Sequence, residues 1–214
     1  MALSDEACYA QLREAILKET FLPNERLIEM DLAQSLGAGR AAIRTALARL
    51  EQDGLVERER YRGARVRLIS RTEAIEILEV RAALESLAAR YAALKVTSEQ
   101  GGTLFTLLAE QRHCIEEGNL LGSSDVNARL HQMILQIAQH SIATRVIEML
   151  KPQNVRFQYR TILVPGRPAQ SLQEHRALVE AITAHEPERA EAAMRHHLFQ
   201  VAEALRQTRG KQEE

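Results

Sequence analysis

The chain has 214 residues and a formal net charge of −1, so its length allows one large domain or two small ones. Because the charge is close to zero, no global field attracts the protein to nucleic acid or to a membrane, and any DNA binding must rest on a local patch. Its two cysteines, Cys8 and Cys114, lie far apart without a CxxC context, which argues against disulfides and fits a cytoplasmic protein. We expect no signal peptide, since the N-terminus carries acids. We also expect no membrane contact, since no stretch approaches the roughly 20 apolar residues of a span.

The first 70 residues predict two helices ahead of a third helix that carries exposed arginines. Apolar residues recur at helical spacing between residues 9 and 17, and a second short helix covers about residues 30–36 before Gly37. The next stretch, AGRAAIRTALARLEQDG over residues 38–54, predicts a third helix that stops at Gly54. Its buried stripe consists of Ile43, Ala46, Leu47 and Leu50. Its opposite face exposes Arg40, Ala41, Arg44 and Thr45.

A β-hairpin follows the third helix. Residues 55–60 and 64–69 predict its strands, because apolar and basic residues alternate in the second of them, and residues 61–63 form the turn. The hairpin carries five arginines, namely Arg58, Arg60, Arg62, Arg65 and Arg67. The order of elements is that of a winged helix-turn-helix, in which the hairpin neighbours the third helix, so the two sets of arginines converge into a DNA-binding patch. The alternative is that the basic hairpin is only a solvated face.

From Thr72 onward the pattern becomes helical throughout. We predict six helices, over residues 73–94, 98–117, 123–139, 142–162, 170–185 and 188–206. Pro152 is expected to kink or split the fourth of them. The predicted fold is therefore mainly α, with a winged helix-turn-helix DNA-binding domain followed by an all-α antiparallel bundle. We assign the domains to residues 1–70 and 76–207, with a linker over 71–75 and a frayed tail over 208–214.

Three of the seven histidines lie on the apolar stripes of three different predicted helices: His131, His175 and His197. A single histidine in this position is most often a core residue with a hydrogen-bond partner. Three of them are harder to explain in that way, because each buried imidazole must satisfy two nitrogens away from water. Convergence on one metal ion satisfies them together, and Asn127, one turn before His131, presents a further ligand on the same helical face.

The stretch LPNERLIEMDLAQSLGAGRAAIRTALARLEQDGLVERERYRGARV resembles the DNA-binding domain of GntR-type bacterial transcription regulators. The resemblance implies that Arg40 and Arg44 contact bases or backbone, with Thr45 beside them, and that Arg62 and Gly63 form the wing tip. It also implies a homodimer that reads a short palindromic operator in double-stranded DNA. The sequence departs from the family pattern at Asn24, where glycine is usual, at Gly39, where a serine or threonine cap is usual, and at Ala41–Ala42, where proline is frequent.

Residues from about 75 to 207 resemble the effector domain of the FCD class within this family (the FadR subfamily), and six helices suggest its VanR-like branch. The resemblance implies that Asn127, His131, His175 and His197 hold a divalent metal, with Zn²⁺ favoured and Ni²⁺ as the alternative. Asn127 stands where the family usually has aspartate. An amide oxygen is a weaker ligand than a carboxylate and leaves more positive charge at the site. Either the metal binds more weakly, or an anionic effector supplies the missing charge.

An open coordination position is a natural seat for a small carboxylate effector. Arg81 lies at the edge of an apolar helix face and could bind this anion, or it could form an intrahelical pair with Glu85. Arg156, Tyr159 and Arg160 are further candidates for the effector pocket.

The resulting hypothesis is a DNA-binding transcription regulator whose operator affinity is controlled by a small carboxylate bound near the metal. The alternative is a DNA-binding dimer without metal, whose helical domain serves dimerisation only. We expect no enzyme activity. Glu174 is the only candidate base for a metal-dependent hydrolase, and as the neighbour of His175 on a helix it points about 100° away from it. A nucleophile elbow and a phosphate loop are also missing.

Overall fold

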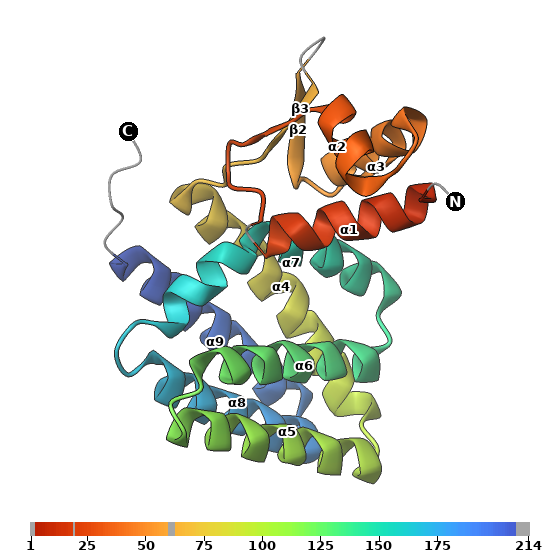
Figure 1. Cartoon of the computed structure of the whole chain (residues 1–214). Coiled ribbons are helices and arrows are strands. Elements are labelled where there is room, and N and C mark those ends of the chain that lie inside the picture. Colours follow the sequence, from red (N-terminus) through yellow and green to blue (C-terminus); the bar gives the residue numbers. More distant parts are fainter. Residues whose placement is uncertain (1–2, 19, 60–62, 209–214) are drawn as a thin grey trace. The chain divides into compact units, whose positions relative to one another are not determined.

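The computed structural model describes residues 3–18, 20–59 and 63–208, without the side chains of residues 59, 152 and 154–160. The chain forms two compact units, shown with their elements in Figure 1. The first comprises residues 1–70 and 149–155, and the second comprises residues 71–148 and 156–214. Each unit is described by itself below. None of the helices in the described ranges is long and apolar enough to span a membrane.

The first unit is a winged helix-turn-helix, as predicted. Its elements are α1 (Asp5–Leu17), β1 (Arg26–Leu27), α2 (Glu29–Leu36), α3 (Arg40–Gln52), β2 (Val56–Glu59) and β3 (Gly63–Val66). The antiparallel pairing of β2 and β3 confirms the hairpin, with Val56 opposite Val66. Strand β1 pairs with the other edge of β3, so the sheet order is β1-β3-β2. We did not predict β1, because two residues are too few to show an alternating pattern.

Helix α3 has the two faces that its sequence predicts. Ile43, Ala46, Leu47 and Leu50 are at most 1% exposed, and they face the core formed with α1, α2 and β2. The residues of the opposite face are exposed: Arg40, Ala41, Arg44 and Thr45. Gly39 is the N-cap in extended conformation, without a side-chain cap bond. The core thus fixes which side chains of α3 face solvent.

Asn24 adopts the left-handed backbone conformation that glycine usually supplies at this position. Its φ is 67°, a value that asparagine tolerates better than most residues. The backbone N–H of Asn24 donates to the Val66 carbonyl at 2.9 Å, and its side-chain Oδ1 accepts from Arg65 Nη1 at 2.7 Å. The asparagine therefore ties the loop before β1 to strand β3.

The second unit is helical throughout its described residues, and its six expected helices are present. They are α4 (Arg71–Lys95), α5 (Ser98–Glu116), α6 (Leu120–Ala138), α7 (Ser141–Ile162), α8 (Arg167–Thr183) and α9 (Pro187–Gln207). Two details differ from the sequence analysis. Residues 71–75, expected as a linker, are helical and begin α4. Pro152 does not divide α7, which continues through it to Ile162.

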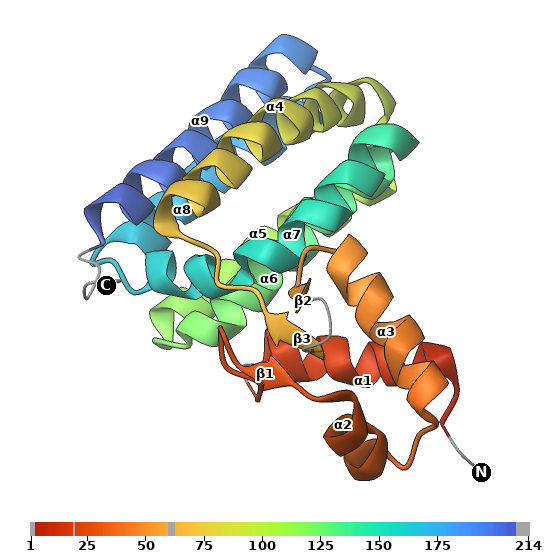
Figure 2. The same ribbon diagram turned by 90° about the horizontal axis from the view of Figure 1, so that it is seen from above.

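Helix α4 runs along α9, as Figure 2 shows. Its buried face contains Ala88, Ala89, Ala92 and Ala93, each at most 1% exposed. Such small side chains let a neighbouring helix approach closely. Helix α8 packs on α9, and α5 packs on α6 and α8. Several core positions where these helices meet carry polar groups rather than apolar ones.

The backbone at Gly63 yields a first prediction about stability. Its φ is +88°, and an added Cβ would lie 3.1 Å from the Leu27 carbonyl oxygen. We expect Gly63→Ala to lower the free energy of unfolding by about 1–2 kcal/mol, because a side chain is strained in this conformation. Urea unfolding followed by circular dichroism measures the effect.

Gly102→Ala is the matched control. A Cβ at this exposed position in α5 meets nothing within 4 Å, so alanine should stabilise the helix by about 0.5–1 kcal/mol. A Gly63→Ala protein as stable as the wild type would contradict the prediction.

Candidate metal centre and DNA-binding surface

Three histidines from three helices meet inside the second unit. His131 comes from α6, His175 from α8 and His197 from α9. They are 3%, 0% and 3% exposed, and one ring nitrogen of each lies within 4.8 Å of the others. The predicted convergence of these histidines is therefore present in the structure.

The outward nitrogen of each ring contacts an oxygen acceptor. His131 Nδ1 lies 2.6 Å from Glu85 Oε2, and His175 Nδ1 lies 2.9 Å from Gln111 Oε1. His197 Nδ1 lies 2.7 Å from Glu174 Oε2. An ionised carboxylate only accepts, so Glu85 and Glu174 favour a proton on Nδ1 of His131 and His197, and the Gln111 oxygen accepts from His175 Nδ1 when that atom carries the proton. A neutral ring in this tautomer keeps a lone pair on Nε2.

The Nε2 atoms of the three rings have no partner outside the cluster among the described residues. His175 Nε2 and His197 Nε2 lie 3.2 Å apart, and His131 Nε2 is buried without a hydrogen-bond partner. Burial holds the pKa values of His175 and His197 well below the usual range, with further lowering from neighbouring positive groups. These rings therefore stay neutral, and their lone pairs face one another. A cation bound by the Nε2 atoms satisfies all three rings, so the donor set fits a divalent metal.

Two arginines, the half-buried Arg81 and the buried Arg167, balance the two carboxylates. Arg81 Nε donates to Glu85 Oε1 at 2.8 Å, and Arg167 Nη2 donates to Glu174 Oε2 at 2.9 Å. Burial raises the pKa of Glu174, and the Arg167 guanidinium opposes that rise. Because each carboxylate is matched by one guanidinium, these pairs leave the charge of a bound metal uncompensated. An anion is the natural ligand for a remaining coordination position.

Asn127 lies on α6 one turn before His131 and is half-buried. Asp125, a carboxylate two residues before Asn127, is exposed. Metal ligation by Asn127 stays a prediction.

Sequence reasoning missed the groups that orient the histidines. Gln111 shares the buried stripe of α5 with Leu104, Leu107 and Leu108, and a polar residue in such a stripe is a signal that could have revealed it. Glu174 points away from His175, as its position on the helix implies, but it reaches His197 on α9 instead. It contacts the outer nitrogen of that ring, so it is not placed as a base toward the inner nitrogens.

The four residues expected to bind the effector are only partly described by the structure. The Arg81 guanidinium is engaged by Glu85, which is the intrahelical alternative that we left open. Arg156, Tyr159 and Arg160 have side chains outside the described part of the chain. Arg167, which we did not predict, is 5% exposed, and its Nη1 is buried without a hydrogen-bond partner in the described structure.

The candidate DNA-binding residues lie on exposed elements of the first unit. Arg44 Nε donates to Glu29 Oε2 at 2.7 Å, and the Thr45 hydroxyl donates to the Ala41 carbonyl at 3.2 Å. Arg40 is exposed and forms no ion pair among the described residues. Arg62 lies outside them, as does Arg60. Base or phosphate contacts by these side chains stay predictions.

The described arginines of the hairpin are partly neutralised. Arg58 lies 4.0 Å from Glu51, and Arg67 lies 3.5 Å from Glu57. The guanidinium of Arg65 donates to Asn24. The hairpin surface is therefore less basic than a count of its arginines indicates.

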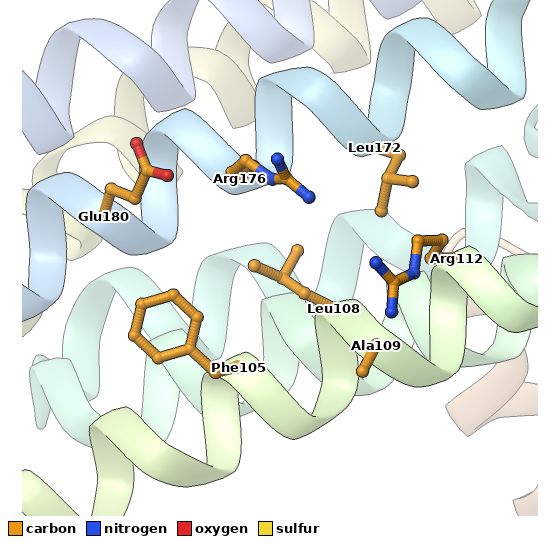
Figure 3. A pocket seen from close by; sticks show the side chains of 7 residues that line it. All are labelled: Phe105, Leu108, Ala109, Arg112, Leu172, Arg176 and Glu180. Carbon is orange, nitrogen blue, oxygen red and sulfur yellow. The ribbon is translucent and has the colours of Figure 1, made fainter.

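A surface pocket of about 280 Å³ lies between α5 and α8. Figure 3 shows that the ends of Arg112 and Arg176 lie between the two helices. The lining residues are Phe105, Leu108, Ala109, Arg112, Leu172, Arg176 and Glu180. They include none of the three clustered histidines, so this pocket is separate from the candidate metal centre.

Comparisons with known proteins match both parts of the chain. Residues 5–66 match the family of bacterial regulatory proteins of the gntR family, and residues 76–200 match the FCD domain. The transcriptional repressor RspR of Escherichia coli K12 is 29% identical over 205 residues, which cover 96% of this chain and 90% of the relative. A probable D-xylose utilization operon repressor of Paenarthrobacter nicotinovorans is 28% identical, covering 79% of this chain and 74% of its own.

Solved structures show the same fold. Escherichia coli McbR/YncC aligns with a TM-score of 0.78 at 22% identity, covering 97% of this chain and 99% of the other. A GntR regulator from Rhodococcus sp. RHA1 aligns with a TM-score of 0.74 at 18% identity, covering 96% and 99%. Together with the winged helix-turn-helix and the matched FCD domain, these likenesses show that the chain belongs to the GntR family of DNA-binding transcription regulators, in its FCD class.

Proposed function

We propose that this regulator senses a small carboxylate at a metal centre in its helical unit, and that binding of this effector changes its affinity for DNA. The observation that carries the proposal is the arrangement of the three histidines. All three Nδ1 atoms contact an oxygen atom of a partner side chain, while His175 Nε2 and His197 Nε2 lie 3.2 Å apart and His131 Nε2 is buried without a hydrogen-bond partner. This is the hydrogen-bonding pattern of histidines that ligate a metal.

His131, His175 and His197 would hold the metal, with Asn127 as a further ligand. Three imidazoles with an open position suit Zn²⁺, and Ni²⁺ is the alternative. A bound metal supplies a positive charge that neutral Asn127 does not offset. An effector carboxylate at the open position would supply the missing negative charge.

Arg167 is a better candidate than Arg81 to bind the effector. Both guanidiniums pair with a carboxylate, but Arg167 also has a buried Nη1 without a partner in the described structure. A buried guanidinium nitrogen in this state favours a carboxylate oxygen. Arg156, Tyr159 and Arg160 stay candidates for the same pocket.

The site connects five helices of the second unit. The histidines come from α6, α8 and α9, and their partners Glu85 and Gln111 come from α4 and α5. A ligand that binds one arrangement of these helices better than another shifts the population between them, and this difference in affinity is the physical requirement for allostery.

We propose that the protein acts as a homodimer on a palindromic operator. The pocket between α5 and α8 offers an apolar surface for a second copy, with Phe105 47% exposed. Arg176 and Glu180 lie one turn apart on α8, so a two-fold related copy can pair each arginine with the other copy's glutamate.

In the DNA complex, Arg40 and Arg44 of α3 would contact the major groove, and Arg62 and Gly63 would approach the backbone or minor groove. Arg44 Nε donates to Glu29 Oε2, which would leave the two Nη groups of the guanidinium for bidentate contact with guanine. Glu29 is thus proposed as a positioning residue for the base contact.

The metal centre is tested by elemental analysis of protein purified without chelator or nickel resin. We expect about one Zn²⁺ or Ni²⁺ per chain in the wild type. The double variant His131→Ala, His175→Ala should lose it, whereas His113→Ala, His196→Ala should keep it, because His113 and His196 are exposed. If the wild type takes up no metal even after zinc or nickel is added, the metal centre is wrong, and an effector would have to bind without a metal anchor.

The DNA surface is tested with duplexes selected from random sequence. Arg40→Ala should weaken binding to the selected duplex by about 1–3 kcal/mol if it contacts a base. Glu29→Gln should weaken specific binding and strengthen binding to unrelated DNA, because it frees Arg44 and removes a negative charge. Glu99→Gln, an equal charge change on α5, is the control. Equal effects of Glu29→Gln on both duplexes would contradict the positioning role.

The effector site is tested with a panel of small mono- and dicarboxylates, read by thermal stabilisation and by release of DNA. Arg167→Lys should bind metal normally but lose about tenfold in effector affinity, since a charge-assisted hydrogen bond contributes roughly 1.5 kcal/mol or more. Arg195→Lys, on the exposed side of α9, should leave effector affinity unchanged. A wild-type response retained in Arg167→Lys would remove Arg167 from the site.

A further inference from the structure

The three partners of the clustered histidines differ in one chemical respect. Glu85 and Glu174 are carboxylates, each held by an arginine, while Gln111 is a neutral amide that is 2% exposed. An ionised carboxylate can only accept a hydrogen bond, whereas an amide accepts through its oxygen and donates through its nitrogen. Gln111 is therefore the partner that can serve either tautomer of its histidine.

This difference matters when no metal is bound. Glu174 keeps the proton of His197 on Nδ1, so His197 Nε2 can only accept. His175 Nε2 lies 3.2 Å away, at hydrogen-bonding distance. A bond between the two rings requires a proton on His175 Nε2, and a neutral His175 must then accept at Nδ1.

We propose that Gln111 selects the tautomer of His175 according to whether the metal is bound. With metal, the amide oxygen would accept from Nδ1–H, in the orientation that places Gln111 Oε1 2.9 Å from His175 Nδ1. Without metal, the amide turns over and its NH₂ donates to Nδ1, so that Nε2–H of His175 donates to His197 Nε2. The proton count of the site is the same in both states. The inference rests on the metal centre of the proposed function.

The role of Gln111 follows from comparing the metal-bound and the metal-free states. A carboxylate in place of Gln111 would favour only the metal-bound tautomer. The amide stabilises the metal-free protein as well, and so it lowers the free-energy gain on metal binding. Gln111 thus keeps metal binding reversible, as a positioning residue that acts through His175.

Two substitutions separate this role from simple packing. Gln111→Glu should raise zinc affinity about tenfold, as outer partners of a metal ligand do, while lowering the melting temperature of the metal-free protein. Gln111→Leu should lower both quantities, because it neither accepts nor donates. Gln136→Glu, the same change at an exposed position of α6, should alter neither. A loss of zinc affinity in both Gln111 variants would overturn the proposal.

Imidazole ¹⁵N spectra of the wild type provide a direct readout that does not depend on these variants. The His175 signals, identified by their loss in His175→Asn, should show a proton on Nε2 without metal and on Nδ1 with zinc. If zinc binds and the tautomer does not change, this inference fails alone. If the wild type binds neither zinc nor nickel, the metal centre of the proposed function fails and the inference fails with it.

Discussion

The hydrogen bonds to the outer nitrogens of three buried histidines are the constraint on which the helical unit depends. An imidazole inside a core needs partners for both nitrogens, and here each Nδ1 has one from another helix. That requirement explains why two carboxylates and an amide are buried, and why Arg81 and Arg167 accompany the carboxylates. Truncating one member of such a pair leaves a buried charge, at a cost of about 3–5 kcal/mol.

The cores of the two units differ in composition. In the winged helix-turn-helix, an apolar core fixes one face of α3 so that Arg40 and Arg44 face solvent. In the helical unit, polar groups are brought into the core and matched to one another there. The first arrangement presents a surface to DNA, and the second, under the proposed function, would hold a metal and a small effector.

The sequence predicts much of the fold and of the candidate metal centre, because helical periodicity indicates which side chains face the core. The stripe of α3 and the inward direction of the three histidines both follow from spacing within one helix. Contacts between helices do not follow from this spacing. The sequence analysis considered Glu174 only in relation to its neighbour His175, whereas its partner in the structure is His197 on another helix. Strand β1 escaped prediction because its two residues carry no pattern. Asn127 and the DNA contacts depend on ligands, and their roles stay predictions.

The burial of the histidines also bears on kinetics. With His131, His175 and His197 at most 3% exposed, an ion enters or leaves only when the surrounding helices open locally, and such openings are rare in well-packed regions. Affinity then sets how full the site is, whereas helix opening sets how fast its occupancy changes. With the metal and effector of the proposed function, such a regulator would keep its ion through brief changes in the supply of metal, while its occupancy by the small-molecule ligand would change faster.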